Sequence, residues 1–464
     1  MKINVCCLCN LVANISWFYP EADTMKKFFP HTRFFCMIII YLWACPAFSG
    51  ALEPLEVLSL KQTIDNALKV NLELKSSQEE TAAALAVKKA RFTNFLPTFS
   101  TRYQFDRKDE GTSIGGFATT SKDEYSFVST VTQPIFAGFS ILRQYDIAKL
   151  GLNSAEIKET LMHQDIVLDA KTVYFTLLKA QKLYKISEET VVQIDAHKNV
   201  AENFYDVGMT PLNDLLQAQV ELANAKQDLI VAKHTLENAE SDFNTLLRRP
   251  INTPVEIEDI LDYVPFEKDL EYCLAQANKN RLEIKIADLE VEIAEKELAL
   301  AKTNYYPSIN LEGNYFREGT QWDVDGGEGI FDPSGWNILA VAKWDFFEWG
   351  RTYYGTHEKR SRLFQAQFQK DKLLDKIQQE VKKAYLGTQE AEQAIITVEK
   401  ALEQAKENFR INEERYKQQV ATSTDVLDAQ TLLSKTRTNY YSALYAFKIA
   451  KATLYRVMGQ GIIQ

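Results

Sequence analysis

The sequence has few of the residues that interrupt helices, and it lacks the motifs of enzymes. Its 464 residues include only 18 glycines and 12 prolines, and no proline follows Pro333. The five histidines, at 31, 163, 197, 234 and 357, show no metal-ligand spacing. No nucleophile, zinc-protease, phosphate-loop or dinucleotide motif occurs. These absences predict a protein that is not an enzyme and that uses no cofactor or metal.

Long apolar runs are also missing. Past residue 50, no segment approaches the roughly 18–20 apolar residues that a membrane helix needs, so any membrane segment there must consist of strands. Charged residues make up 25% of the chain and the formal net charge is −10, which argues against a nucleic-acid partner. The length allows two or three ordinary domains.

The N-terminus has the features of an export signal. A basic segment, 25–33, precedes an apolar segment, 34–44, which is too short to span a membrane, and the small residues of 47–49 offer a cleavage site. We interpret residues 1–49 as an N-terminal extension plus a signal peptide, with translation starting at Met25.

Cysteine is nearly absent from the rest of the chain. Five of the six cysteines lie at or before Cys45, so the exported chain would keep only Cys273 and form no intramolecular disulfide. Residues 42–45 also match a marginal lipobox in which Cys45 would be acylated, although Trp43 is unusual at its position.

The two halves of the chain match each other at an offset of 210 to 211 residues. The matching segments are 71–75 with 281–285, 95–98 with 305–308, 133–136 with 344–347, and 214–219 with 425–430. Because the offset hardly drifts, we interpret the chain as two copies of one supersecondary unit.

Each copy is predicted to contain a helix, a β-hairpin, a long helix and a return helix. In the first repeat, 50–248, these are a helix over 72–95, a hairpin over 98–134, and helices over 139–204 and 212–247. In the second, 271–464, they are 281–305, 308–346, 351–417 and 424–458, and residues 249–270 link the repeats. The long helix reaches roughly 100 Å, and the two shorter helices together nearly match it. We therefore expect the shorter pair to stack end to end along its long partner.

The predicted strands alternate apolar and polar residues. In strand 98–107, Phe99, Tyr103 and Phe105 share one face and alternate with polar residues. Runs of about ten such residues are typical of outer-membrane strands, and two hairpins packed on a soluble helical body are the alternative. Since lipid does not tolerate open sheet edges, four strands require several chains to share one barrel. The fold class is mainly α with a small β part.

A duplicated unit with this order resembles the TolC family of outer-membrane efflux channels over essentially all of residues 50–464. The motifs are the Leu-Pro and Tyr-Pro junctions at 96–97 and 306–307, the strand-to-helix segments 133–136 and 346–350, and the tip segments 205–209 and 425–430. The resemblance implies a homotrimer in outer-membrane lipid, whose 12-stranded β-barrel continues into a periplasmic α-helical barrel. It also implies a periplasmic adaptor and an inner-membrane pump of the RND or ABC class.

The resemblance assigns residues of a periplasmic gate. In the family, aspartates on the last return helix form rings at the entrance, and Asp425 and Asp428 occupy those positions. A latch tyrosine corresponds to Tyr416, whereas Ala421 replaces the latch arginine, so the chain lacks the arginine of that latch.

The same acids also have simpler interpretations. Residues 422–425 would form an ordinary helix cap in which Asp425 is the acidic member. Asp428 lies one turn deeper and is not explained by a cap, while Asp214 in the first repeat is expected to be structural. The loop residues Asp323, Asp325 and Glu328 lack the remaining ligands of a calcium loop, so a solvated extracellular loop is favoured.

The tip turns are the candidate docking sites. Val207, Gly208 and Met209 resemble the adaptor-docking turn of the family, although Gly208 would suit any left-handed turn. The counterpart 418–420 lacks glycine, so we predict that the two turns differ in geometry. Thr210 is predicted to cap the return helix, with Pro211 at its first position.

The predicted function is a passive duct in the outer membrane, with a long periplasmic extension and energy supplied by a pump. One alternative is the outer-membrane component of a type I protein secretion system. From another class come a periplasmic adaptor and a structural coiled coil. An adaptor would carry one helical hairpin flanked by small β-domains, and a coiled coil would not need four amphipathic strands.

Overall fold

The computed structural model describes residues 57–461 except 116, 261, 328–329 and 331. The predicted signal peptide and Cys45 lie outside this part. The elements in chain order are α3 (Leu60–Val70), α4 (Leu72–Thr93), β1 (Thr98–Arg107), β2 (Thr112–Ile114), β3 (Phe117–Thr120), β4 (Asp123–Ala137), α5 (Ser140–Asp206), α6 (Leu212–Leu246), α7 (Leu270–Asn280), α8 (Leu282–Ala301), the 3₁₀ helix η2 (Lys302–Tyr305), β5 (Ser308–Gly319), β6 (Ser334–Lys343), α9 (Arg351–Lys417) and α10 (Ser423–Val457). The predicted fold class, mainly α with a small β part, is confirmed.

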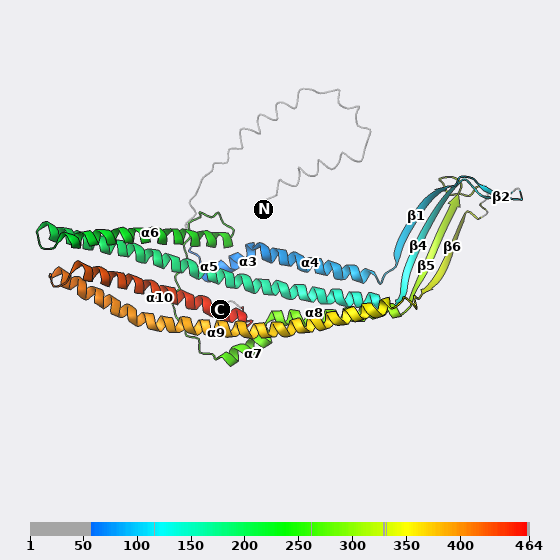
Figure 1. The fold of residues 1–464 in the computed structure, drawn as a ribbon. Helices are drawn as coiled ribbons and strands as arrows, with labels where there is room; N and C mark the ends of the chain where they lie inside the picture. Colours follow the sequence, from blue (N-terminus) through cyan, green and yellow to red (C-terminus); the bar gives the residue numbers. More distant parts are fainter. Residues whose placement is uncertain (1–56, 116, 261, 328–329, 331, 462–464) are drawn as a thin grey trace, which may run out of the picture. The chain divides into compact units, whose positions relative to one another are not determined.

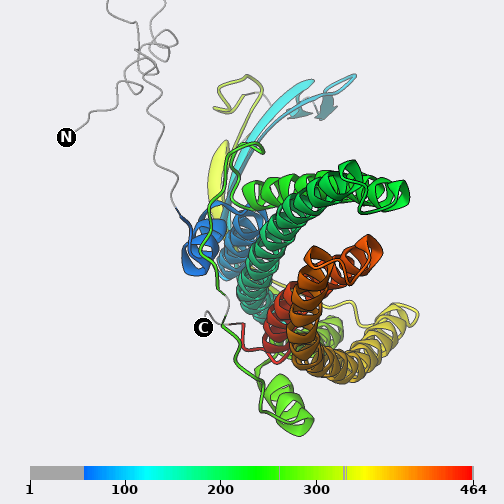
Figure 2. The same ribbon diagram turned by 90° about the vertical axis from the view of Figure 1, so that its left-hand side faces the viewer.

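Two long helices, α5 and α9, organise the helical part. Each has 67 residues. Helices α4 and α6 pack along successive parts of α5, and α8 and α10 pack along α9 (Figure 1). Near the tips α6, α5, α10 and α9 follow one another side by side, as the view along the helices shows (Figure 2). Near the sheet the order is α4, α5, α8 and α9.

Both long helices begin with two consecutive residues in the left-handed conformation. These are Gly138 and Phe139 before α5, with φ of 60° and 69°, and Trp349 and Gly350 before α9, with φ of 52° and 80°. A Cβ atom on Gly138 would come within 2.7 Å of the Thr303 carbonyl oxygen. Glycine is therefore required there by close approach as well as by φ.

The short helices α3 and α7 were not predicted. Each is separated from the next helix by one extended residue, Asn71 before α4 and Arg281 before α8. The Asn71 side chain accepts a hydrogen bond from the Leu74 N–H at 3.0 Å and so caps α4. Because these breaks contain neither glycine nor proline, composition did not reveal them.

The largest core surrounds the middle of α5, where α3 and the end of α6 meet it. Tyr174 is fully buried there beside Phe243, and its hydroxyl donates to the Glu258 carbonyl oxygen at 2.6 Å. A second core packs α7 against α9 and the end of α10, with the fully buried Cys273 next to Val381. These cores hold the midpoint of the helical layer.

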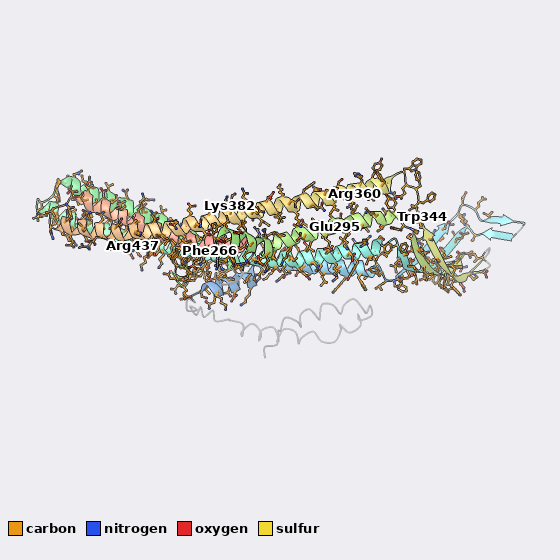
Figure 3. All side chains as sticks on the ribbon, turned by 90° about the horizontal axis from the view of Figure 1, so that it is seen from below. Phe266, Glu295, Trp344, Arg360, Lys382 and Arg437 are labelled. Atoms are coloured by element: carbon orange, nitrogen blue, oxygen red, sulfur yellow. The ribbon has the colours of Figure 1, made fainter. Side chains whose placement is uncertain are left out.

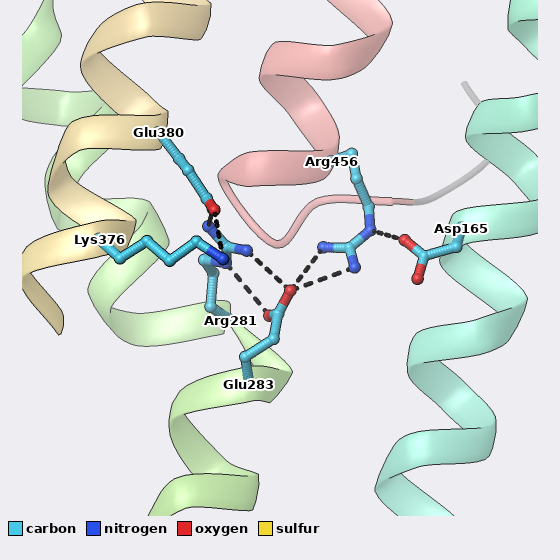
Figure 4. Close-up of polar contacts among 6 residues, drawn as sticks. All are labelled: Asp165, Arg281, Glu283, Lys376, Glu380 and Arg456. Atoms are coloured by element: carbon cyan, nitrogen blue, oxygen red, sulfur yellow. Dashed lines mark hydrogen bonds and ion pairs between the residues drawn. The ribbon is translucent and has the colours of Figure 1, made fainter. Parts of the chain in front are cut away.

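An ionic network built on two buried arginines joins four helices near the second core (Figure 4). Arg281 donates to Glu283 at 2.8 Å and to Glu380 on α9 at 2.6 Å. Arg456 on α10 donates to Asp165 on α5 at 2.6 Å and to Glu283 at 3.2 Å. Burial acts to raise the pKa of Glu283, but bonds from Arg281 and the charges of both arginines outweigh it and lower the pKa to about 2.

The four long strands form one antiparallel sheet in the order β1-β4-β5-β6. One face is aromatic and aliphatic across all four strands, because residues directly opposite in the register share a face. Its cross-strand pairs include Phe99 with Val131, Tyr103 with Phe127, Phe105 with Tyr125, Tyr315 with Trp336, and Gly313 with Ile338. Phe99 and Trp336 are 77% and 74% exposed. Within the described residues, β1 and β6 have unpaired outer edges.

The strand ends differ from expectation in two places. Strand β4 continues through Pro134 to Ala137, with a register shift between Pro134 and Phe136, so this proline does not end the strand. Strand β6 ends at Lys343, one residue before Trp344, whose indole N–H donates to the Tyr305 carbonyl at 3.2 Å (Figure 3). No helix in the described part is long and apolar enough to cross a membrane.

Candidate functional site at the helical tips

The two tip turns have the same geometry, so the prediction that they differ was wrong. In the first, Gly208 has a φ of +74°, its N–H donates to Tyr205, and the Met209 N–H donates to Phe204. In the second, Gln419 has a φ of +62° and donates to Tyr416, and Val420 donates to Arg415. Both are Schellman turns. Hydrogen bonding holds Gln419 in a conformation that glycine adopts more readily.

The start of α6 also differs from expectation. Pro211 is the N-cap residue with extended backbone, and the helix begins at Leu212, so Pro211 is not the first helical residue. The Thr210 hydroxyl is buried and has no hydrogen-bond partner among the described residues. Thr210 is therefore not the cap, because the extended proline after it moves the helix start one residue onward.

Asp425 takes part in a capping box at the start of α10. Its carboxylate accepts hydrogen bonds from the N–H and the hydroxyl of Thr422, both at 2.8 Å, and its own N–H donates to the Thr422 hydroxyl at 3.2 Å. The Thr422 N–H is the main reason that the pKa of Asp425 is lowered. The carboxylate is exposed, so capping leaves it facing solvent.

Asp428 lies three residues further along α10, on the same exposed face as Asp425. No hydrogen bond or ion pair holds its side chain within the described residues. The neighbouring Val426 and Leu427 are buried, and Leu427 packs among residues of the first helical hairpin. The buried side of α10 thus directs both aspartates outward.

Tyr416 joins the two helical hairpins. It is 3% exposed, and its ring lies 4.8 Å from the His197 ring and 5.6 Å from the Phe204 ring, both on α5. Burial, and then the negative charge of Asp214 on α6, raise the pKa of Tyr416. Ala421, at the position where the family resemblance implies a latch arginine, is half-buried.

His197 is a site residue that the sequence analysis did not select. Its Nε2 lies 2.9 Å from the Ser423 hydroxyl at the start of α10. Burial lowers the pKa of His197, while the charges of Glu413 and Asp214 act in the opposite direction. The imidazole is therefore held in its neutral form between the hairpins. A lone histidine inside a long helix gives no local signal of this contact.

Further polar pairs along α10 connect the two helical hairpins. They are Gln217 with Thr424 at 2.7 Å, Gln193 with Gln430 at 2.6 Å, Thr190 with Ser434 at 2.8 Å, and Glu189 with Arg437 at 2.6 Å. Arg437 is labelled in Figure 3. These pairs align α10 with the first hairpin and so position the exposed aspartates.

The first tip exposes apolar side chains. Val207 is 68% exposed and Met209 is 58% exposed. The second tip shares this feature at Val420, which is 60% exposed, and the Gln419 side-chain amide donates to the Met209 sulfur at 3.0 Å.

The described residues contain no group of histidine, cysteine, aspartate or glutamate side chains that could hold a metal ion.

The exposed aromatic and aliphatic face of the sheet has the alternation that is typical of outer-membrane strands. A family model for outer membrane efflux proteins matches residues 63–247 and 273–460. The chain belongs to this family and is an outer-membrane efflux protein. The predicted TolC-family resemblance is confirmed.

Individual relatives agree with this assignment. The chain is 21% identical over 326 residues to outer membrane protein TolC of Vibrio cholerae serotype O1, covering 68% of this chain and 72% of that protein. The CmeC outer membrane channel of Campylobacter jejuni has the same fold, with a TM-score of 0.76 and 19% identity over 87% of this chain and 86% of that one. The MtrE outer membrane channel of Neisseria gonorrhoeae, in its open state, has a TM-score of 0.72 and 19% identity, covering 87% of this chain and 89% of that one.

Proposed function

We propose that three copies of this chain form one outer-membrane duct, and the unpaired sheet edges are the observation that carries this proposal. Neighbouring strands are antiparallel throughout the order β1-β4-β5-β6. The outer edge of β6 in one copy can therefore pair antiparallel with β1 of the next. Closure removes the open edges that lipid excludes, and three copies give the 12 strands of the family resemblance.

The helical layer supports the same closure. Helices α4 and α9 form the two lateral edges of the helical layer near the sheet. Helix α4 leads into the edge strand β1, and α9 follows the edge strand β6. Both carry exposed apolar side chains, including Val87 at 50% and Phe368 at 70%. In a ring of copies, α9 would cover α4 of its neighbour and bury these side chains.

The tips supply the proposed periplasmic contacts. The exposed Val207 and Met209 beside Gly208 form an apolar surface for a periplasmic adaptor. Asp425 and Asp428 are proposed to face the threefold axis, with Tyr416 holding the second hairpin against the first. Six like charges would then surround one narrow entrance and attract cations.

The duct is proposed to perform no chemistry. An adaptor and an RND or ABC pump of the inner membrane would supply the energy and select the substrate. The two repeats, 50–248 and 271–464 with the link 249–270, are proposed as the structural units, and the two segments matched by the family model support this division.

Bilayer recordings of the full chain test this function. We expect a cation-selective conductance that La³⁺ blocks from the tip side, and native mass spectrometry should give three chains per particle. The Asp425→Asn/Asp428→Asn double variant should lose the block, while Asp214→Asn should keep it. An unchanged block would place the gate elsewhere, and a monomer without conductance would contradict the duct.

A further inference from the structure

A cavity of about 220 Å³ lies between the two helical hairpins, near the tips. Its walls come from α5 on one side and from α9 and α10 on the other, and they include His197, Glu413 and Gln430. The apolar part of the wall includes Phe409 and Leu427. An apolar cavity of about 150 Å³ holds one benzene ring, so this cavity has room for a ring and a small polar head.

Two buried polar side chains in this wall lack partners. Gln430 is 3% exposed, and its Nε2 donates to Gln193, but its Oε1 has no hydrogen-bond partner among the described residues. The Tyr416 hydroxyl is also buried and forms no well-aligned hydrogen bond among the described residues, although the Ser423 hydroxyl lies nearby. Buried polar atoms are rarely left unsatisfied. These two atoms therefore indicate a site built to receive a hydrogen-bonding group.

The unsatisfied atoms define the chemistry of the ligand. An amide Oε1 can only accept, a tyrosine oxygen can accept, and the Glu413 carboxylate adds a negative charge. Lys417 also lines the cavity, but its ammonium is held by Glu413 at 3.1 Å and by Glu414 at 3.4 Å. A ligand with several N–H donors and one positive charge could replace Lys417 at Glu413.

We propose that this cavity binds a small aromatic monocation of the amidine or guanidine type. Its ring would lie against Phe409 and Leu427, and its N–H groups would bond to Gln430 and Glu413. Because the walls belong to both hairpins, such a ligand binds only while α5 and α10 are apposed. It therefore stabilises this arrangement by mass action.

Benzamidine is the probe for the binding test, using the full chain in detergent and titration calorimetry. We expect saturable binding at millimolar or lower concentrations, and weaker binding of benzamide, its neutral counterpart. Gln430→Leu should weaken benzamidine binding about tenfold through loss of the acceptor. The matched control is Gln219→Leu, the corresponding exposed position of the first repeat, which should bind like the wild type.

Three results would overturn the site. The first is no saturable binding of benzamidine to the wild type, and the second is binding that Gln430→Leu leaves unchanged. The third is loss of binding in Asp425→Asn/Asp428→Asn, which would place the cation on the exposed aspartates instead.

A disulfide assay tests the effect on the hairpins. The hydroxyls of Thr190 on α5 and Ser434 on α10 are 2.8 Å apart, so Thr190→Cys with Ser434→Cys should form a bridge across the hairpins. The described cysteine Cys273 is fully buried and should not compete. Saturating benzamidine should speed bridging, and Gln430→Leu should remove this effect. If benzamidine saturates the wild-type site but leaves the rate of disulfide bridging unchanged, the ligand does not stabilise the apposed hairpins. Both assays need no pump or membrane, so their failure leaves the export function standing.

Discussion

Gln419 adopts, in the turn between α9 and α10, the left-handed conformation that Gly208 adopts between α5 and α6, and its amide contacts the adjacent Met209 sulfur. The backbone φ values are +62° and +74°, and the Gln419 Nε2 lies 3.0 Å from the Met209 Sδ. The two turns are therefore paired in geometry and joined by a side-chain contact. Because the two turns share this geometry, the residue found in one turn indicates which substitutions the other should tolerate.

Gly208→Gln should keep the first turn folded, because glutamine already holds this conformation at Gln419 and a Cβ atom at Gly208 meets nothing within 4 Å. Gly208→Val should destabilise the turn locally by about 1–3 kcal/mol, since a β-branched residue is poorly tolerated at positive φ. Hydrogen exchange at the Met209 amide should accelerate only in the valine variant. The same variant should lose adaptor crosslinking at normal abundance. Equal exchange in both variants would contradict the role of turn geometry.

Acidification should loosen the contact between the hairpins through His197. Because burial lowers the folded-state pKa of His197, the unfolded or separated state binds the proton more readily. The stability contribution is present above the unfolded pKa of about 6.5, and it is lost as the pH falls from there toward the lowered folded value. The negative charges of Glu413 and Asp214 act on the ring in the opposite direction and reduce the effect without reversing it.

Hydrogen exchange near Ser423, measured between pH 7 and pH 5, should show this loosening after correction for intrinsic exchange rates. His197→Gln should remove the pH dependence. His234, which lies exposed on α6 beside Glu237, provides the control, because His234→Gln should leave the pH dependence intact. A profile that follows His234 instead would exclude His197 as the source.

Arg281→Met should destabilise the helical midpoint by about 3–5 kcal/mol, since it removes one partner of a buried ion pair. Glu283 would keep only Arg456, and its pKa should rise from about 2. The wild-type contribution should be lost as the pH falls from about 4.5 toward 2, whereas the variant should lose it at higher pH. Chemical denaturation at several pH values measures both effects. Arg410→Met, which removes an exposed pair with Glu407, should change stability little.

Ile338→Lys should impair insertion of the sheet into the outer membrane. Ile338 is 64% exposed on the aromatic face of β6, and a lysine facing lipid costs about 2–4 kcal/mol near the bilayer midplane. Asn337→Lys changes the neighbouring residue on the opposite face and should be tolerated. Membrane fractionation and the yield of oligomer compare the two. Equal assembly of both variants would mean that this face does not contact lipid.

The large elements could be read from the sequence because their signals are local. The scarcity of breakers from 139 to 204 and from 351 to 417 predicted the helices α5 and α9, whose hydrogen bonds lie within one turn. Alternation in 98–107 predicted β1 and its apolar face, since successive side chains of a strand point to opposite sides. Asp425 was identified both as a gate candidate and as a cap, and the structure adds its hydrogen bonds with Thr422.

Other features depended on contacts that no local pattern encodes. The break at Arg281 has no glycine, proline or side-chain cap, whereas the break at Asn71 carries a local signal because the asparagine side chain caps α4. Gln419 has no intrinsic preference for positive φ, and the surrounding turn imposes it. His197 and Ser423 are 226 residues apart, so the histidine's lowered pKa exists only once α5 and α10 are apposed. Periodicity along the chain therefore determined the elements, while burial between distant helices decided the contacts and charge states at the tips.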